Sequence, residues 1–161
     1  MGVNTLIKFS VEQMLFAKDL AIKRSGSMNH ADTKNSQNFI KDKQPWWRHF
    51  IGVVGEMAYS IYSDYPIDQT TIGRGDSGVD FPNGVQVKAS DTVLKPNLMF
   101  PVSQFNRKIA RTYVLVWVFP TGHQAEIIGS ISREDIEKHR TEHDFGYGNT
   151  YIVSNKHLEL V

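Results

Sequence analysis

The segment that most constrains the fold is Thr112–Phe119, whose sequence TYVLVWVF places apolar side chains at almost every position. An exposed strand alternates polar and apolar residues, whereas a strand covered on both faces is apolar throughout. The sequence therefore predicts a central strand here, with other elements packed on both sides. Pro120-Thr121-Gly122-His123 predicts a turn after it, leading into a partner strand at about 124–131.

Two helices are predicted before this strand. Ser10-Val11-Glu12-Gln13 has the spacing of a capping box, so we expect an amphipathic helix over 11–24. The apolar residues expected on its buried face are Val11, Met14, Leu15 and Ile22.

A second helix is predicted over about 46–62, because Pro45 suits its first turn. Its expected buried stripe is Phe50, Val53, Val54, Met57 and Ile61. Glycine inside a helix costs up to about 1 kcal/mol relative to alanine. Gly52 and Gly55 therefore indicate that another element, most simply a sheet, packs very close to this helix.

The remaining elements are shorter. Val79-Asp80-Phe81 and 85–89 flank Pro82-Asn83-Gly84, which predicts a β-hairpin. A short helix is expected near 103–110, another from Ser132 to about 140, and a last edge strand at 151–153. This order predicts a single α/β domain over 1–161 with a central mixed β-sheet flanked by helices, and a mobile basic loop over 25–44.

Positive charge is unevenly distributed along the chain. Residues 1–50 hold eight Lys or Arg against four acids, and residues 88–111 hold five basic residues against Asp91 alone. Such patches can bind a polyanion even when the net charge is only +1. Most charge clusters are simply solvated surface, so charge alone leaves nucleic acid as one possible partner.

Several classes of protein are excluded or disfavoured by composition. The chain has no cysteine, which excludes disulfide frameworks, thiolate nucleophiles and cysteine-based zinc sites. No segment resembles a signal peptide or the roughly 18 apolar residues of a membrane span. We therefore expect a cytoplasmic protein, in a prokaryote or a phage-infected cell, with no membrane partner.

Four residues together suggest phosphodiester hydrolysis: Glu56, Asp80, Gln86 and Lys88. This reaction needs a divalent cation that polarises the phosphate and lowers the pKa of a bound water. Mg²⁺ prefers oxygen ligands, which Glu56, Asp80 and Gln86 can supply. The Lys88 ammonium can orient the attacking water and stabilise developing negative charge.

These residues also resemble a known motif. Gly55-Glu56 in a helix, Gly78-Val79-Asp80 and then Gln86-Val87-Lys88 are similar to the PD-(D/E)XK nuclease superfamily, particularly its small phage and prokaryotic members. The resemblance covers about 45–161. It implies a restriction-endonuclease-like core, Mg²⁺-dependent DNA cleavage with Mn²⁺ able to substitute, and frequent dimerisation. It also implies metal ligation by Glu56, Asp80 and Gln86, and water activation by Lys88.

The chain departs from the family pattern at two positions. Val79 replaces the usual proline, and Gln86 replaces the usual acid, as in some branches of the superfamily. Residues opposite one another in an antiparallel pair share a face. The site therefore predicts a three-residue loop over 83–85, or a bulge, which would place Asp80 opposite Lys88. A two-residue turn would instead point Asp80 away from it.

Other residues are expected to contact the DNA backbone, because phosphate contacts position the substrate. These nucleic-acid-binding candidates are Arg48, Ser90, Lys95, Arg107, Lys108 and Arg111. A homodimer is a further expectation, since cutting both strands requires two reaction centres.

Three alternatives remain at this stage. Asp80 and Lys88 can form a plain cross-strand ion pair, with Glu56 an exposed helical acid. The chain can also be an inactive nuclease-fold protein that binds DNA. Finally, His139, Glu142 and His143 spell H-x-x-E-H, an inverted zinc-peptidase motif, although a solvated helix end explains that segment better. Gly73–Gly78 spells G-x-G-x-x-G but leads into a predicted strand, so we interpret it as a loop.

Overall fold

The computed structural model describes residues 4–26, 45–69, 79–107 and 110–161. The larger part of the predicted 25–44 loop and the glycine-rich segment 73–78 lie outside these ranges. Residues 25 and 26, expected in the loop, instead end helix α1 (Val11–Gly26).

The centre of the molecule is a four-stranded sheet in the order β1-β5-β4-β2. Its strands are β1 (Thr5–Lys8), β2 (Val85–Ser90), β4 (Thr112–Phe119) and β5 (Gln124–Ser132). β2 and β4 run parallel, whereas the other pairs are antiparallel. The sheet is therefore mixed, as predicted, and β4 is an interior strand.

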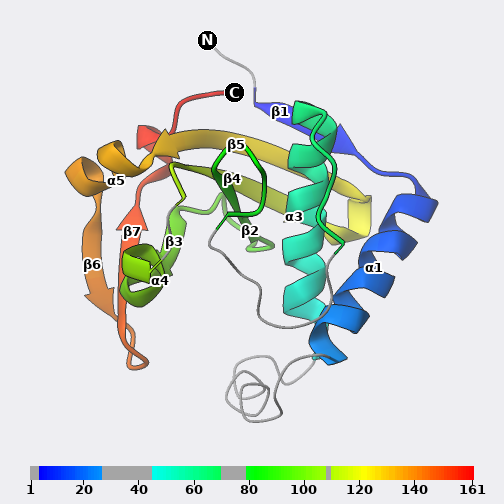
Figure 1. Ribbon diagram of the computed structural model, residues 1–161, viewed down its shortest axis with the longest axis horizontal. Coiled ribbons are helices and arrows are strands. Elements are labelled where there is room, and N and C mark those ends of the chain that lie inside the picture. Colours follow the sequence, from blue (N-terminus) through cyan, green and yellow to red (C-terminus); the bar gives the residue numbers. More distant parts are fainter. Residues whose placement is uncertain (1–3, 27–44, 70–78, 108–109) are drawn as a thin grey trace.

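Both faces of this sheet are covered (Figure 1). Helix α3 (Trp47–Ser63) packs on one face, against Val114, Val116 and Val118 of β4, and α1 packs against α3. The alternate residues Tyr113 and Leu115 face a second apolar cluster. This division explains why the β4 segment is apolar at nearly every position.

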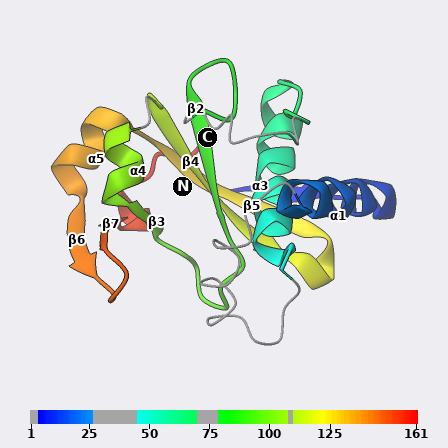
Figure 2. The ribbon, with the colours of Figure 1, turned by 60° about the horizontal axis from the view of Figure 1, so that its bottom comes forward.

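The second layer contains a three-stranded sheet in the order β3-β7-β6 (Figure 2). Its strands are β3 (Leu98–Pro101), β6 (Thr141–Asp144) and β7 (Asn149–Val153), accompanied by α4 (Val102–Arg107) and α5 (Arg133–His139). Two short 3₁₀ turns, η1 (Pro120–Gly122) and η2 (Asn155–His157), complete the described part.

The capping box predicted for α1 is present in both directions. The Ser10 amide donates to Gln13 Oε1 at 2.8 Å, and the Gln13 amide donates to Ser10 Oγ at 3.1 Å. The predicted buried face was largely wrong, because Val11, Leu15 and Ile22 are exposed and only Met14 is buried. The side chains of α1 that are buried are instead Met14, Ala17, Leu20 and Ala21.

The α3 stripe is buried as predicted except for Ile61, which is 43% exposed near the end of the helix. The two helical glycines differ. A Cβ on Gly55 would lie 2.6 Å from Ala89 Cβ on β2, whereas a Cβ on Gly52 would meet nothing within 4 Å. The close approach of α3 to the sheet therefore occurs at Gly55, the residue before Glu56.

This difference predicts opposite effects of alanine at the two glycines. Gly52→Ala should raise the free energy of unfolding by about 0.5–1 kcal/mol through helix propensity. Gly55→Ala should lower it by about 1–3 kcal/mol, because the added methyl overpacks against Ala89. Urea unfolding of both variants beside wild type measures these changes. Equal effects would contradict the close helix–sheet contact.

The predicted hairpin was wrong in its first strand, since residues 79–81 form no strand in the described chain. The amides of Asp80 and Phe81 both donate to the Val85 carbonyl, at 2.9 and 3.2 Å, and the Gly84 amide donates to the Phe81 carbonyl. Gly84 has a φ of +82°, which favours glycine. The chain thus turns tightly into β2, which pairs with β4 instead.

Other predictions need smaller corrections. Strands β1, β3 and β6 were missed, and β7 is the middle strand of its sheet rather than an edge strand. His139 is the last residue of α5, whereas Glu142 and His143 belong to β6. The helical placement on which the zinc-peptidase alternative depended is therefore wrong.

Candidate functional site

The candidate site lies where α3 and the 79–84 turn meet the edge strand β2. Among the strands of the described ranges, β2 pairs with β4 alone. On its other side, the Val87 amide donates to Asp80 Oδ2 at 2.7 Å. This bond fixes the Asp80 carboxylate at the outer edge of β2, where the two faces of the sheet meet.

Glu56 reaches the same region from α3. Its two carboxylate oxygens accept from Arg24 Nη1 at 3.1 and 3.2 Å, and Arg24 Nη2 donates to the Asp68 carbonyl at 2.6 Å. The Glu56 side chain is only 15% exposed. Arg24 thus links the end of α1 to α3 and to the segment that follows α3.

The electrostatic environment of Glu56 is unusual. Burial, followed by repulsion from the Asp80 charge, raises the pKa of Glu56 to about 7. Arg24 opposes this rise, and Asp68 adds to it. Burial and the Arg24 charge also lower the pKa of the nearby His49. Strongly shifted acids in a recess are typical of functional sites, although structural networks also shift pKa values.

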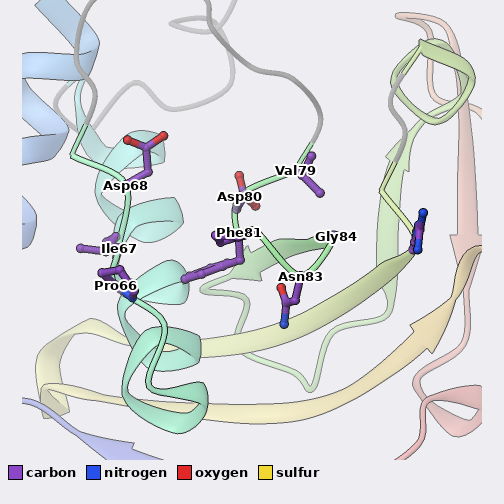
Figure 3. Close-up of a pocket in the computed structure, with 10 residues that line it drawn as sticks. Pro66, Ile67, Asp68, Val79, Asp80, Phe81, Asn83 and Gly84 are labelled. Carbon is purple, nitrogen blue, oxygen red and sulfur yellow. The ribbon is translucent and has the colours of Figure 1, made fainter.

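An open cavity of about 740 Å³ lies beside Asp80. Figure 3 shows Asp68 and Asp80 on two different segments that line it, with Phe81 and Asn83 on the turn that continues from Asp80. Arg111, one of the predicted DNA contacts, also lines this cavity. The cavity therefore combines two carboxylates with one guanidinium group.

Gln86 and Lys88 lie on the other face of β2. Val85, Val87 and Ala89 pack toward α3, so strand alternation turns the residues between them away from that helix. Lys88 Nζ donates to Gln104 Oε1 of α4 at 3.0 Å. Gln86 is 4% exposed, and its Oε1 accepts no hydrogen bond from any residue that the structure describes.

The structure thus brings Glu56 and Asp80 together and places Gln86 and Lys88 across the same edge strand. The 79–81 segment forms no strand in the described chain, so the hairpin that would place Asp80 opposite Lys88 is not formed. Glu56 is also not an exposed helical acid, because it pairs with Arg24 and is 15% exposed. The exposed-acid part of the structural alternative is therefore wrong, whereas a structural ion pair between Glu56 and Arg24 fits the geometry.

The predicted DNA contacts fall into groups. Lys95 and Ser90 line a second cavity of about 580 Å³ together with Lys88. Arg48 and Arg107 are exposed on α3 and α4. Lys108 lies outside the described residues.

Sequence reasoning missed three residues of this region: Arg24, Asp68 and Gln104. Arg24 was counted only as part of the basic opening segment, and it lies 32 positions from Glu56. Asp68 and Gln104 belong to no motif. Only the tertiary structure brings these side chains to the site.

A divalent cation requires a suitable donor set. Within the described ranges, no three Asp, Glu, His or Cys side chains are grouped closely enough to hold a metal ion. Mg²⁺ commonly uses one or two carboxylates and completes its shell with other oxygens and water. Glu56, Asp80 and the unbonded amide oxygen of Gln86 match that chemistry in oxygen type and charge.

Comparisons of the chain with protein-family models, curated proteins and solved structures find no match. In the described part of the chain, no helix has the length and apolar character needed to cross a bilayer. Function is therefore inferred from the residues of the site.

Proposed function

We propose that the protein is a Mg²⁺-dependent DNA endonuclease of PD-(D/E)XK type, which hydrolyses phosphodiester bonds with an activated water. The observation that carries this proposal is the pair of neighbouring acids Glu56 and Asp80, of which the buried Glu56 has its pKa raised to about 7. Two neighbouring carboxylates repel one another, and burial of Glu56 strengthens that repulsion. A cation between them and the substrate would relieve that repulsion.

The proposed metal donors are Glu56 and Asp80, with Mn²⁺ able to replace Mg²⁺. Gln86, the third predicted donor, lies on the opposite face of β2 from α3 and would have to reach the cation around the edge of that strand. When bound, the cation supplies Lewis-acid polarisation of the phosphate and lowers the pKa of a coordinated water. Asp80 is held in place for this role by the Val87 amide. Glu56 is positioned by Arg24, whose charge keeps part of the glutamate population ionised near neutral pH.

Lys88 is the proposed group that orients the attacking water and stabilises charge on the phosphate. The Gln104 amide oxygen holds its ammonium group at 3.0 Å and fixes the side chain without contributing an opposing charge. A positioned cation of this kind is most useful when charge develops in the transition state.

The proposed substrate is DNA, bound mainly through phosphate contacts. Arg111 lines the cavity beside Asp80, and Ser90 and Lys95 line the cavity beside Lys88. Arg48, Arg107 and Lys108 would extend the contact surface. We further propose that two copies act together on a duplex, within the cytoplasm.

Nicking of supercoiled plasmid tests this proposal. We expect wild type to nick the plasmid with Mg²⁺ or Mn²⁺ and to stop when EDTA is added. Lys88→Ala should cut at least about 100-fold more slowly, as expected when a group that stabilises transition-state charge is removed. Lys138→Ala, an exposed lysine on α5, is the matched control and should retain activity.

One observation favours a second candidate, an inactive nuclease-fold protein that binds DNA. The three charged residues central to the proposal already have protein partners, Glu56 with Arg24, Asp80 with the Val87 amide and Lys88 with Gln104. Under this alternative, wild type would retard DNA in a gel but would cut no faster than Lys88→Ala. That outcome would reject the proposed nuclease activity and support the alternative that the protein only binds DNA.

A further inference from the structure

The loop between β2 and β3, residues 91–97, presents two apolar side chains to solvent. Val93 is 94% exposed and Leu94 is 80% exposed. They are the most exposed large apolar side chains in the described part of the chain. Single exposed apolar residues are common on protein surfaces, but this loop is unusual in how firmly it is held.

The first half of the loop is fixed by hydrogen bonds from two indoles. Trp47 Nε1 donates to Asp91 Oδ2 at 2.9 Å, and Trp117 Nε1 donates to the Thr92 carbonyl at 2.8 Å. Thr92 Oγ1 also donates to the Leu94 carbonyl at 2.8 Å. Residues 91 and 92, which precede the exposed Val93 and Leu94, are therefore held in place by these hydrogen bonds.

The second half is anchored by Asn155, which lies in η2. Its side-chain amide donates to the Pro96 carbonyl at 3.1 Å, and its backbone amide donates to Asn97 Oδ1 at 3.0 Å. A loop held at both ends loses little conformational freedom when its tip meets a partner. This rigidity distinguishes Val93 and Leu94 from apolar residues that are exposed on a mobile loop.

The surroundings of the tip indicate the chemistry of the partner. Val93, Leu94 and Lys95 line the same cavity as Lys88, so the tip adjoins the proposed water-orienting residue, whereas Asp80 lines the other cavity. Lys88 and Lys95 give this cavity two basic side chains, which complement a phosphate backbone. An apolar tip between basic side chains matches the wedges with which proteins separate stacked bases.

We propose that Val93 and Leu94 form a wedge that enters the base stack of duplex DNA next to the scissile phosphate. This inference rests on the proposed function and adds a substrate class, namely DNA that is locally unstacked or already distorted. A site with a wedge should act more readily on a bubble than on a fully paired duplex, since the bubble needs no unstacking.

Fluorescence of 2-aminopurine within a duplex, measured in EDTA so that no cutting occurs, tests the wedge directly. Wild type should increase the fluorescence as the base unstacks. The double variant Val93→Ser/Leu94→Ser should lose about nine-tenths of that increase. Val11→Ser, which alters an exposed valine on α1, is the control and should behave as wild type.

A cleavage assay with Mg²⁺ supplies the second readout. The double variant should cut a fully paired duplex about tenfold more slowly than wild type and a bubble of the same sequence at nearly the wild-type rate. Equal slowing on both substrates, or an unchanged fluorescence signal, would overturn the wedge while leaving the nuclease proposal standing. A fluorescence increase that depends on Val93 and Leu94, without any cutting by wild type, would reject the nuclease proposal and leave the wedge standing.

Other occupants of the tip have distinct signatures. Binding to anionic lipid vesicles that depends on Val93 and Leu94, without base unstacking, would overturn the proposal in favour of a membrane surface. A dimer in sedimentation that becomes a monomer in the double variant, again without unstacking, would assign the tip to a contact between copies.

Discussion

Replacing Asp80 by asparagine is expected to slow Mg²⁺-dependent nicking of DNA by about 100-fold or more while leaving the fold unchanged. The fold should persist because the asparagine amide oxygen can still accept the 2.7 Å hydrogen bond from the Val87 amide. What the variant removes is the negative charge at the edge of β2. The rate loss would therefore report on charge and metal ligation rather than on misfolding.

The measurement is the initial rate of plasmid nicking at saturating Mg²⁺, with circular dichroism and urea unfolding to verify the fold. Asp144→Asn, an exposed acid on β6, is the matched control and should retain the wild-type rate. A wild-type rate in Asp80→Asn would remove Asp80 from the reaction centre.

Replacing Glu56 by glutamine is expected to stabilise the protein at alkaline pH and to abolish cutting. The unfolded chain ionises this residue near its ordinary pKa of 4.5, whereas the folded protein holds the pKa at about 7, because of burial and the nearby Asp80 charge. Between these values the folded state binds a proton that the unfolded state has lost. Stability contributed by protonated Glu56 is therefore complete below pH 4.5 and is lost as the pH rises through 7.

Glutamine stays neutral at every pH, so the variant should escape this loss. A pKa difference of this size corresponds to roughly 3 kcal/mol, which is the expected gain in unfolding free energy at pH 8. At pH 4 the variant and wild type should have nearly equal stability. Urea unfolding at both pH values, in EDTA, measures the difference.

The control for this experiment is Glu142→Gln, which changes an exposed acid on β6 and should give no pH-dependent gain. A loss of stability in Glu56→Gln at pH 8 would contradict the account, because it would make the Arg24 ion pair the larger effect. A gain in stability of Glu56→Gln at pH 8, together with a loss of cutting, would indicate that Glu56 serves function although its charge destabilises the fold.

The parts of the fold that sequence reasoning predicted have strong local signals. β4 was predicted because burial on both faces leaves a nearly continuous apolar run. α5 was predicted from Ser132, whose hydroxyl accepts from the Asp135 amide at 3.1 Å. Gly55 was expected to mark a close approach to a sheet, and its neighbour is indeed Ala89. Each of these signals requires only a few adjacent residues.

The missed parts lack such signals. All four residues of β6 are exposed, so this edge strand has no apolar alternation to detect. The 79–84 segment contains residues that favour a turn. Whether residues 79–81 also form a strand depends on which strand pairs with β2, and in the structure that strand is β4. Tertiary packing determines this pairing.

The candidate site, like the fold, was predicted only in part. Motif spacing selected Glu56 and Asp80, which the structure brings into electrostatic contact. It could not predict that Arg24 would pair with Glu56, because a contact across 32 positions leaves no local pattern. It also could not predict that β2 would present Gln86 and Lys88 on the face opposite α3, because that depends on the strand's register and partner.

The proposed divalent-cation site at Glu56 and Asp80 can be tested by direct binding of Mn²⁺. Free Mn²⁺ can be followed by its electron paramagnetic resonance signal during titration of the protein at pH 8, without DNA. We expect wild type to remove Mn²⁺ from solution, Mg²⁺ to compete for the same site, and Asp80→Asn to bind at least about tenfold more weakly. Equal Mn²⁺ binding by wild type and Asp80→Asn, or no binding by wild type, would contradict the account.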